Sequence, residues 1–179
     1  MAPALPGDRR SLEQSLETAR AEFTLARLQL ERAEAIIEYS TRHSIAADVA
    51  AAVYDVALAE GVDPGLACRL VKVESDFVPA ATSSAGAIGY TQILPSTARL
   101  YEPGLTIEQL YERRTNLRLG FRYLRDLLDR YEGSPEDRLR LALLAYNRGP
   151  ARVQALLDAG QDPQNGYAAT VMRGYHRNN

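Results

Sequence analysis

The feature that most constrains this chain is a run of apolar residues that recur at alternating spacings of four and three. Polar and charged side chains fill the positions between them. This period is typical of an α-helix with one apolar face. It predicts one long amphipathic helix over residues 11–40, about 40 Å long across its apolar run. The apolar positions are Leu12, Leu16, Ala19, Phe23, Ala26, Leu30, Ala33 and Ile37.

Two arrangements suit the apolar face of this helix. Three of its eight positions are alanine, which favours close packing against the rest of the chain or a helical hairpin. The spacing also persists for nearly four heptads, which is long enough for a coiled coil. The pattern therefore leaves open whether the Leu12–Ile37 face packs within the chain, self-associates or binds a protein partner.

Composition excludes several classes of protein. The 179 residues are 46% hydrophobic, enough to bury a sizeable core. A formal charge of -2 gives no basic field that would attract nucleic acid. One cysteine, Cys68, excludes an internal disulfide, and with only two histidines beside it no zinc site of the usual spacing can form. We therefore expect no nucleic-acid partner and no metal.

The first ten residues contain proline and glycine without apolar periodicity, which predicts a flexible lead over residues 1–10. They lack a charged start followed by an apolar run, so they do not predict a signal peptide. No stretch of the chain reaches the roughly 18 apolar residues that span a bilayer. Any targeting segment is expected to lie outside this chain.

Beyond a polar break at residues 40–44, helix signals recur to the C-terminus. Asp63 and Ser134 each precede a proline at the first position of a predicted helix, where a side chain that caps the helix is preferred. The helix after Ser134 is apolar nearly all round, so we expect it to be central. Residues 76–94 carry loop chemistry, and no convincing run of alternating strand residues appears. The predicted fold class is all-α.

Glu74 is a carboxylate on the apolar face of its predicted helix. Burial raises the pKa of a carboxyl group, and the last turn of a helix disfavours its charged form further. A carboxylic acid that stays protonated near neutral pH can act as a general acid in glycoside cleavage. The plainer interpretation is an acid just beyond the buried zone that pairs with Lys72, Arg69 or a backbone donor. Glu74 shares its face with Ala67, Leu70 and Val71.

Two later segments carry polar groups that could serve the same site. The loop that holds Gly86 and Gly89 allows close backbone approach, and it lacks the Gly-Lys-Ser/Thr ending of a nucleotide-binding loop. Tyr146 and Asn147 end an apolar helix, and they supply a hydroxyl and an amide that could hold an acetamido group or a developing charge. Each segment alone also fits a plain structural role, as a connection or a helix end.

In their order and spacing, four segments resemble the catalytic domain of the soluble lytic transglycosylase family, whose fold is similar to goose-type lysozyme. The resemblance covers about residues 45–175. It implies a lysozyme-like helical catalytic domain preceded by the long amphipathic helix. The segments are Glu74-Ser75, Gly86–Ala98, Asn116–Leu124 and Ala145–Pro150.

The resemblance also implies roles for single residues. Glu74 matches the family's single catalytic acid. Tyr90 and Thr91 stand where the family usually has Leu and Met, so the contacts that these two positions make with sugar or stem peptide stay open. The residues implied in substrate binding are Ser75, Ser83, Gln92, Tyr146, Asn147 and Tyr167.

The implied reaction breaks the β-1,4 bond between N-acetylmuramic acid and N-acetylglucosamine in peptidoglycan glycan strands. Glu74 would protonate the glycosidic oxygen and then take the proton of the C6 hydroxyl, which closes a 1,6-anhydro ring. The acetamido group of the substrate would stabilise the cationic sugar, so neither a second carboxylate nor a cofactor is needed. This substrate places the protein in the bacterial cell envelope or periplasm.

Two alternatives remain. A lysozyme-type muramidase would hydrolyse the same bond, but it would need a second acid to activate water. The candidate, Asp76, lies only two residues from Glu74 and off its helix face. A non-catalytic peptidoglycan-binding or scaffold protein would instead work through a partner of the long helix. The glutamate and the Tyr146-Asn147 pair argue against this last alternative.

Overall fold

The computed structural model describes residues 6–173 and residue 175. Within this part of the chain, helices are joined by turns and loops, with two isolated β-bridges and no longer strand. The predicted all-α class is confirmed. The helices are α1 Pro6–His43, α2 Ala47–Ala59, α3 Pro64–Ser75, α4 Pro95–Tyr101, α5 Ile107–Tyr111, α6 Arg113–Arg130, α7 Pro135–Arg148, α8 Pro150–Asp158 and α9 Tyr167–Met172.

The helices begin where local capping signals predict. The Asp63 carboxylate accepts a hydrogen bond from the backbone N–H of Leu66, 2.9 Å away, and so caps α3. Ser134 caps α7 in the same way, by accepting from the N–H of Asp137 at 3.1 Å. A proline follows each cap at the first helical position, where its missing N–H is not needed.

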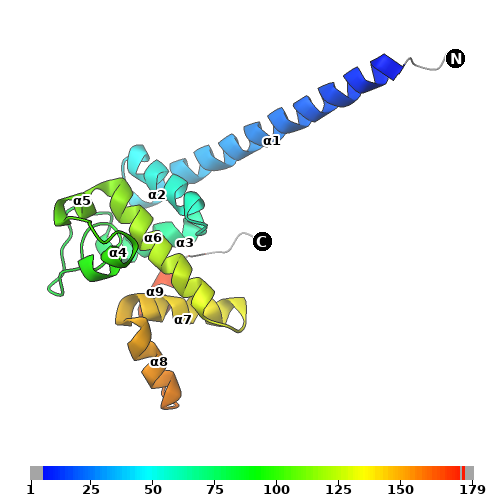
Figure 1. The fold of residues 1–179 in the computed structure, drawn as a ribbon. Coiled ribbons are helices and arrows are strands. Elements are labelled where there is room, and N and C mark those ends of the chain that lie inside the picture. The colour runs from blue at the N-terminus through cyan, green and yellow to red at the C-terminus, as the bar shows by residue number, and fades with distance from the viewer. Residues whose placement is uncertain (1–5, 174, 176–179) are drawn as a thin grey trace.

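The core lies where α2, α3, α6 and α7 meet, and α9 closes it from the side of α3 and α7 (Figure 1). Phe121 of α6 is fully buried there, as are four consecutive residues of α7, Ala142 to Ala145. The central position of α7 agrees with the prediction from its sequence, which is apolar on nearly all faces of the helix. Burial of a side chain such as Phe121 stabilises the fold by about 2–3 kcal/mol.

α1 departs from the sequence expectations at its N-terminus. It begins at Pro6 instead of residue 11, so the second half of the expected flexible lead at residues 1–10 is helical. Proline suits a helix start because its ring fixes φ near the helical value. Residues 1–5 lie outside the described residues.

α1 also projects away from the other helices for most of its length, as Figure 1 shows. Residues 9–34 are all exposed, and only its C-terminal part contacts the core, through residues such as Ala35 and Tyr39. Arg32 also forms a bidentate ion pair with Asp55 of α2, in which its Nε and Nη2 lie 2.6 and 2.7 Å from the two carboxylate oxygens. Of the arrangements that the pattern left open, packing of the Leu12–Ile37 face against the other described residues is not observed, since Phe23 on this face is 72% exposed.

Candidate active site

Glu74 lies in the last turn of α3, at the junction with the long loop that leads to α4. The helix stops one residue later, after Ser75, because Asp76 and Phe77 adopt positive φ values of 52° and 60°, which an α-helix cannot contain. The Glu74 side chain is partly buried. The hydroxyl of Tyr167, at the start of α9, donates a hydrogen bond to its Oε1.

The surroundings of Glu74 favour its protonated form. Burial raises the pKa of this carboxyl from its ordinary value to about 7, although the hydrogen bond from Tyr167 acts in the opposite direction. Burial and the nearby Glu74 charge raise the pKa of both Tyr146 and Tyr167 well above the ordinary value. The two hydroxyls therefore stay protonated as donors, beside a carboxyl group that can both give and accept a proton near neutral pH.

Tyr146 joins α7 to the loop between α3 and α4. Its hydroxyl donates a 2.8 Å hydrogen bond to the backbone oxygen of Thr91. Its ring packs against Tyr123 of α6, with ring centroids 5.2 Å apart. The side chain is thus fixed at both ends, next to Glu74, whose charge acts on it.

Three other predicted site residues lie in or against this loop, and their polar groups are bonded to backbone. The buried Ser75 hydroxyl donates to the oxygen of Tyr90 at 2.8 Å. The Gln92 amide donates to two backbone oxygens, at 3.0 and 3.1 Å. Ser83 accepts a 3.1 Å bond from the N–H of Ala87. These bonds hold the loop in shape, and any contact of the three residues with substrate stays a prediction.

Asn147 is exposed at the end of α7 and reaches the segment before α9. Its Oδ1 accepts a 2.8 Å hydrogen bond from Nδ2 of Asn165. Oδ1 of Asn165 in turn accepts from the backbone N–H of Tyr167 at 3.1 Å. Asn147 therefore supports, through Asn165, the segment that places the Tyr167 hydroxyl on Glu74.

Asn116 of α6 forms hydrogen bonds that hold the loop between α3 and α4 in place. This role was not predicted from the sequence. Asn116 is fully buried, and its amide donates to the backbone oxygens of Ile88 and Leu110 at 2.9 and 3.0 Å. Its Oδ1 accepts from both N and Oγ1 of Thr91, each at 2.9 Å. The sequence shows a polar residue among the apolar positions of α6. It does not show which loop residues that polar residue bonds to.

Gly89 makes this arrangement possible. A Cβ at this position would lie 2.4 Å from Nδ2 of Asn116, and the residue has a φ of +73°. Both conditions require glycine.

Asp76, the sequence candidate for a second acid, is exposed. It caps α3 in a left-handed conformation, and its carboxylate forms an ion pair with Lys72 on the exposed surface. Burial and the Tyr167 hydrogen bond set the pKa of Glu74. Among residues 6–173 and 175, no three His, Cys, Asp or Glu side chains come together as a metal site would require.

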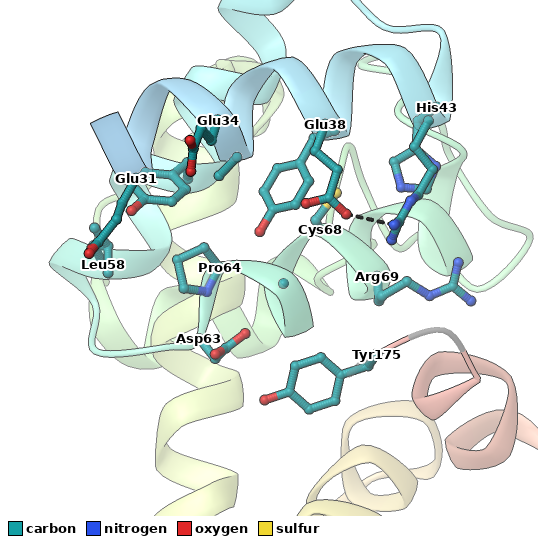
Figure 2. Close-up of a pocket in the computed structure, with 15 residues that line it drawn as sticks. Glu31, Glu34, Glu38, His43, Leu58, Asp63, Pro64, Cys68, Arg69 and Tyr175 are labelled. Carbon is teal, nitrogen blue, oxygen red and sulfur yellow. Dashed lines mark ion pairs between the residues drawn. The ribbon is translucent and has the colours of Figure 1, made fainter. Parts of the chain in front are cut away.

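A cavity of about 740 Å³ lies elsewhere, between the C-terminal half of α1 and the N-terminal half of α3 (Figure 2). Three glutamates of α1, Glu31, Glu34 and Glu38, line one side of it. Cys68 lines the other side, and burial raises the pKa of its thiol to about 12, so the thiol is inert near neutral pH. None of the predicted site residues borders this cavity. In the described residues no helix is both long and apolar enough to cross a membrane.

Comparison with known proteins shows which proteins this chain is similar to. Over 88 residues the chain is 36% identical to a transglycosylase of Enterobacteria phage PRD1, an alignment that covers 49% of this chain and 30% of the phage protein. It is 33% identical to a membrane-bound lytic murein transglycosylase C of Actinobacillus pleuropneumoniae, over 55% of this chain and 30% of that protein. The chain thus matches less than a third of the length of either relative.

A solved structure gives the same picture at the level of the fold. The lytic transglycosylase Slt of Pseudomonas aeruginosa, in an inactive mutant form, superposes with a TM-score of 0.57 and 26% identity, over 69% of this chain and 22% of that one. The family model of the Transglycosylase SLT domain matches residues 52–165, more than half of the chain. The resemblance seen in the sequence is confirmed, and the chain belongs to the Transglycosylase SLT domain family.

Proposed function

We propose that this chain is a peptidoglycan lytic transglycosylase, which cleaves the β-1,4 bond between N-acetylmuramic acid and N-acetylglucosamine. The observation that carries the proposal is Glu74, a partly buried carboxyl group with a pKa of about 7 that receives a hydrogen bond from Tyr167. Membership of the family supports the same reaction. Such a substrate lies in the bacterial cell envelope, so we propose that the protein acts there.

In the first step the protonated Glu74 donates its proton to the glycosidic oxygen while the bond from this oxygen to C1 breaks. The leaving N-acetylglucosamine thus receives a neutral hydroxyl group. The acetamido carbonyl of the muramic acid stabilises the positive charge that develops at C1, which is the role a second carboxylate has in most glycosidases. The raised pKa of Glu74 supports this step, because an ordinary glutamic acid has lost its proton at pH 7.

In the second step the Glu74 carboxylate removes the proton from the C6 hydroxyl of the same muramic acid. The C6 oxygen attacks C1 and closes a 1,6-anhydro ring, and Glu74 regains its proton. The Tyr167 hydroxyl supports this step, since a donor to the carboxylate stabilises the charged form between the two transfers. No water, metal or cofactor enters the balance.

Hydrolysis of the same bond by a muramidase has less support. It would need a base that activates water. Asp76, the neighbouring carboxylate in the sequence, is tied to Lys72 on the surface. The chemical nature of the reaction product separates the two activities directly.

The test is mass spectrometry of soluble fragments from purified peptidoglycan that has been treated with the protein or with Glu74→Gln. We expect fragments that end in 1,6-anhydro-N-acetylmuramic acid, and a roughly 1,000-fold lower yield with Glu74→Gln, since proton transfer to a poor leaving group is lost. Glu132→Gln, which makes the same change at an exposed glutamate, is the matched control and should retain full activity.

Two results would contradict the proposal. Reducing ends in place of anhydro ends would mean that water reaches the intermediate and that the protein is a muramidase. Absence of any product, together with retention of the protein on sedimented peptidoglycan, would make it a binding module.

A further inference from the structure

The apolar face of α1 is an exposed feature that the proposed reaction does not use. We name it the α1 seam, and its members are Leu12, Leu16, Ala19, Phe23, Ala26, Leu30, Ala33 and Ile37. Its large side chains are 51–72% exposed, with Leu16 and Phe23 at the two extremes. Nothing in residues 6–173 and 175 buries this face of the projecting helix, and contiguous exposed apolar surface marks an interaction site.

The α1 seam points away from the body of the protein. Ala35 and Tyr39 mark the side of α1 that packs on the core, and Arg32 pairs with Asp55 from the same side. At about 100° per residue, the seam is centred about 180° around the helix from these residues. A partner helix can therefore lie along the seam without meeting the body from which α1 projects.

We propose that the α1 seam binds the same seam of a second copy of this chain, as a parallel and in-register two-stranded coiled coil. The spacings of four and three place the seam residues at the two apolar heptad positions. Leu16, Phe23, Leu30 and Ile37 occupy position a, and Leu12, Ala19, Ala26 and Ala33 occupy position d. Each residue then faces its own counterpart, so layers of large apolar side chains alternate with layers of alanine.

Charges beside the seam determine the orientation. In a parallel pair, position g of one helix meets position e of the next heptad in its partner. Glu22 stands at g and Arg27 at the following e, so two symmetric ion pairs form between the copies. An antiparallel pair that aligns the whole seam would instead place Arg20 opposite Arg27 and Glu13 opposite Glu34, four contacts between like charges.

A parallel pair also leaves the candidate active site free. Both bodies lie at the same end of the coiled coil and on its outer sides, because the seam faces away from each of them. The seam includes none of the residues that surround Glu74. The proposal therefore does not depend on the reaction, and its tests measure association alone.

The first test is the mass of the full chain in solution, by sedimentation equilibrium between 1 and 100 μM. We expect twice the 19.7 kDa of one chain. Phe23→Asp places two charges in the centre of the seam and should weaken association at least roughly 100-fold. The matched control is Leu25→Asp, because Leu25 lies on the same helix, is 57% exposed and stands off the seam, so this variant should remain a dimer.

The second test determines the orientation by cross-linking. Ala26→Cys brings two sulfurs together only where Ala26 faces its counterpart, as it does in the parallel pair, so mild oxidation should give a disulfide-linked dimer. Thr24→Cys, two residues away and outside the seam, should not cross-link. The buried Cys68 gives no background, as the wild-type chain should demonstrate.

Three outcomes would overturn the proposal. A wild-type chain that remains monomeric at 100 μM has no such seam contact. Equal loss of association in Leu25→Asp and Phe23→Asp would mean that the seam is not the interface. A dimer that Phe23→Asp dissociates but in which Ala26→Cys does not cross-link would contradict the parallel register.

Discussion

The Tyr167 hydroxyl donates a hydrogen bond to the carboxylate of Glu74, although the two residues are 93 positions apart in the chain. The contact joins the last turn of α3 to the first turn of α9. It also opposes the effect of burial, because a donor favours the charged carboxylate while burial favours the neutral acid. The balance leaves the pKa of Glu74 at about 7, where one group can serve as acid and then as base.

Tyr167→Phe should move the pH dependence of the proposed reaction. The protonated Glu74 starts the reaction, so activity should fall as the pH rises through its pKa of about 7. Removal of the Tyr167 hydroxyl removes the effect that lowers this pKa. The falling limb should therefore shift to higher pH by roughly one unit. Release of soluble peptidoglycan fragments between pH 5 and 9 gives the profile.

The matched control for this change is Tyr111→Phe, which removes the hydroxyl of a tyrosine on α5 that is bonded to Thr82. Its profile should coincide with that of the wild type. A falling limb in Tyr167→Phe that stays in place or moves to lower pH would contradict the assigned acid.

Glu74→Gln should make the protein more stable at alkaline pH. The pKa of Glu74 is raised on folding from its ordinary value of 4.5 to about 7, so the folded state holds a proton that the unfolded state has released between these pH values. Stability from this group is full below pH 4.5 and is lost as the pH rises to 7. Replacement by neutral glutamine should therefore stabilise the protein at pH 8 by up to about 3 kcal/mol.

Urea unfolding of both proteins at pH 8 and at pH 4.5 measures this difference, which should nearly vanish at the lower pH. Glu132→Gln alters an exposed glutamate and should change stability little at either pH. Equal stability of wild type and Glu74→Gln at pH 8 would mean that the carboxylate is not buried in solution.

The helices were predictable from the sequence because their signals are local. Asp63 and Ser134 each cap a backbone N–H only three residues later, so a short sequence window contains the whole interaction. The environment of α1 was not predictable in this way. Its alanines fit packing within the chain as well as packing with a partner, and only the direction in which α1 leaves the body excludes the former.

The candidate site was predictable in its members but less so in their contacts. The position of Glu74 at the end of a helix, among apolar neighbours, predicted a raised pKa, and burial raises it. The bonds of Tyr167 to Glu74 and of Asn116 to the loop join segments far apart in the chain, which local patterns do not reveal. The resemblance matched residue types and did not reveal which group the Ser75 hydroxyl contacts. In the structure it bonds to the backbone oxygen of Tyr90.

The two glycines of the loop should respond differently to alanine. Gly86 and Gly89 both have positive φ, which costs an alanine about 1–2 kcal/mol. A Cβ at Gly86 meets nothing within 4 Å, whereas at Gly89 it would collide with the Asn116 amide. Gly89→Ala should therefore cost at least about 2 kcal/mol more than Gly86→Ala in urea unfolding, since the buried bonds of Asn116 must shift. Equal costs would mean that the loop can move away from Asn116 freely.

Ser75→Ala and Asn147→Ala should separate support of the loop from contact with substrate. The Ser75 hydroxyl is buried and bonded to the Tyr90 oxygen, so its loss should lower the free energy of unfolding by about 1–2 kcal/mol and reduce kcat as the loop loosens.

Asn147 is exposed, and its Asn165 bond lies at the surface, so its loss should change stability by under about 0.5 kcal/mol. If Asn147 binds the sugar as the resemblance implies, Asn147→Ala should raise KM several-fold. Urea unfolding and steady-state cleavage of soluble glycan strands provide both measurements. A rise in KM in Ser75→Ala without loss of stability would instead place the Ser75 hydroxyl on the substrate.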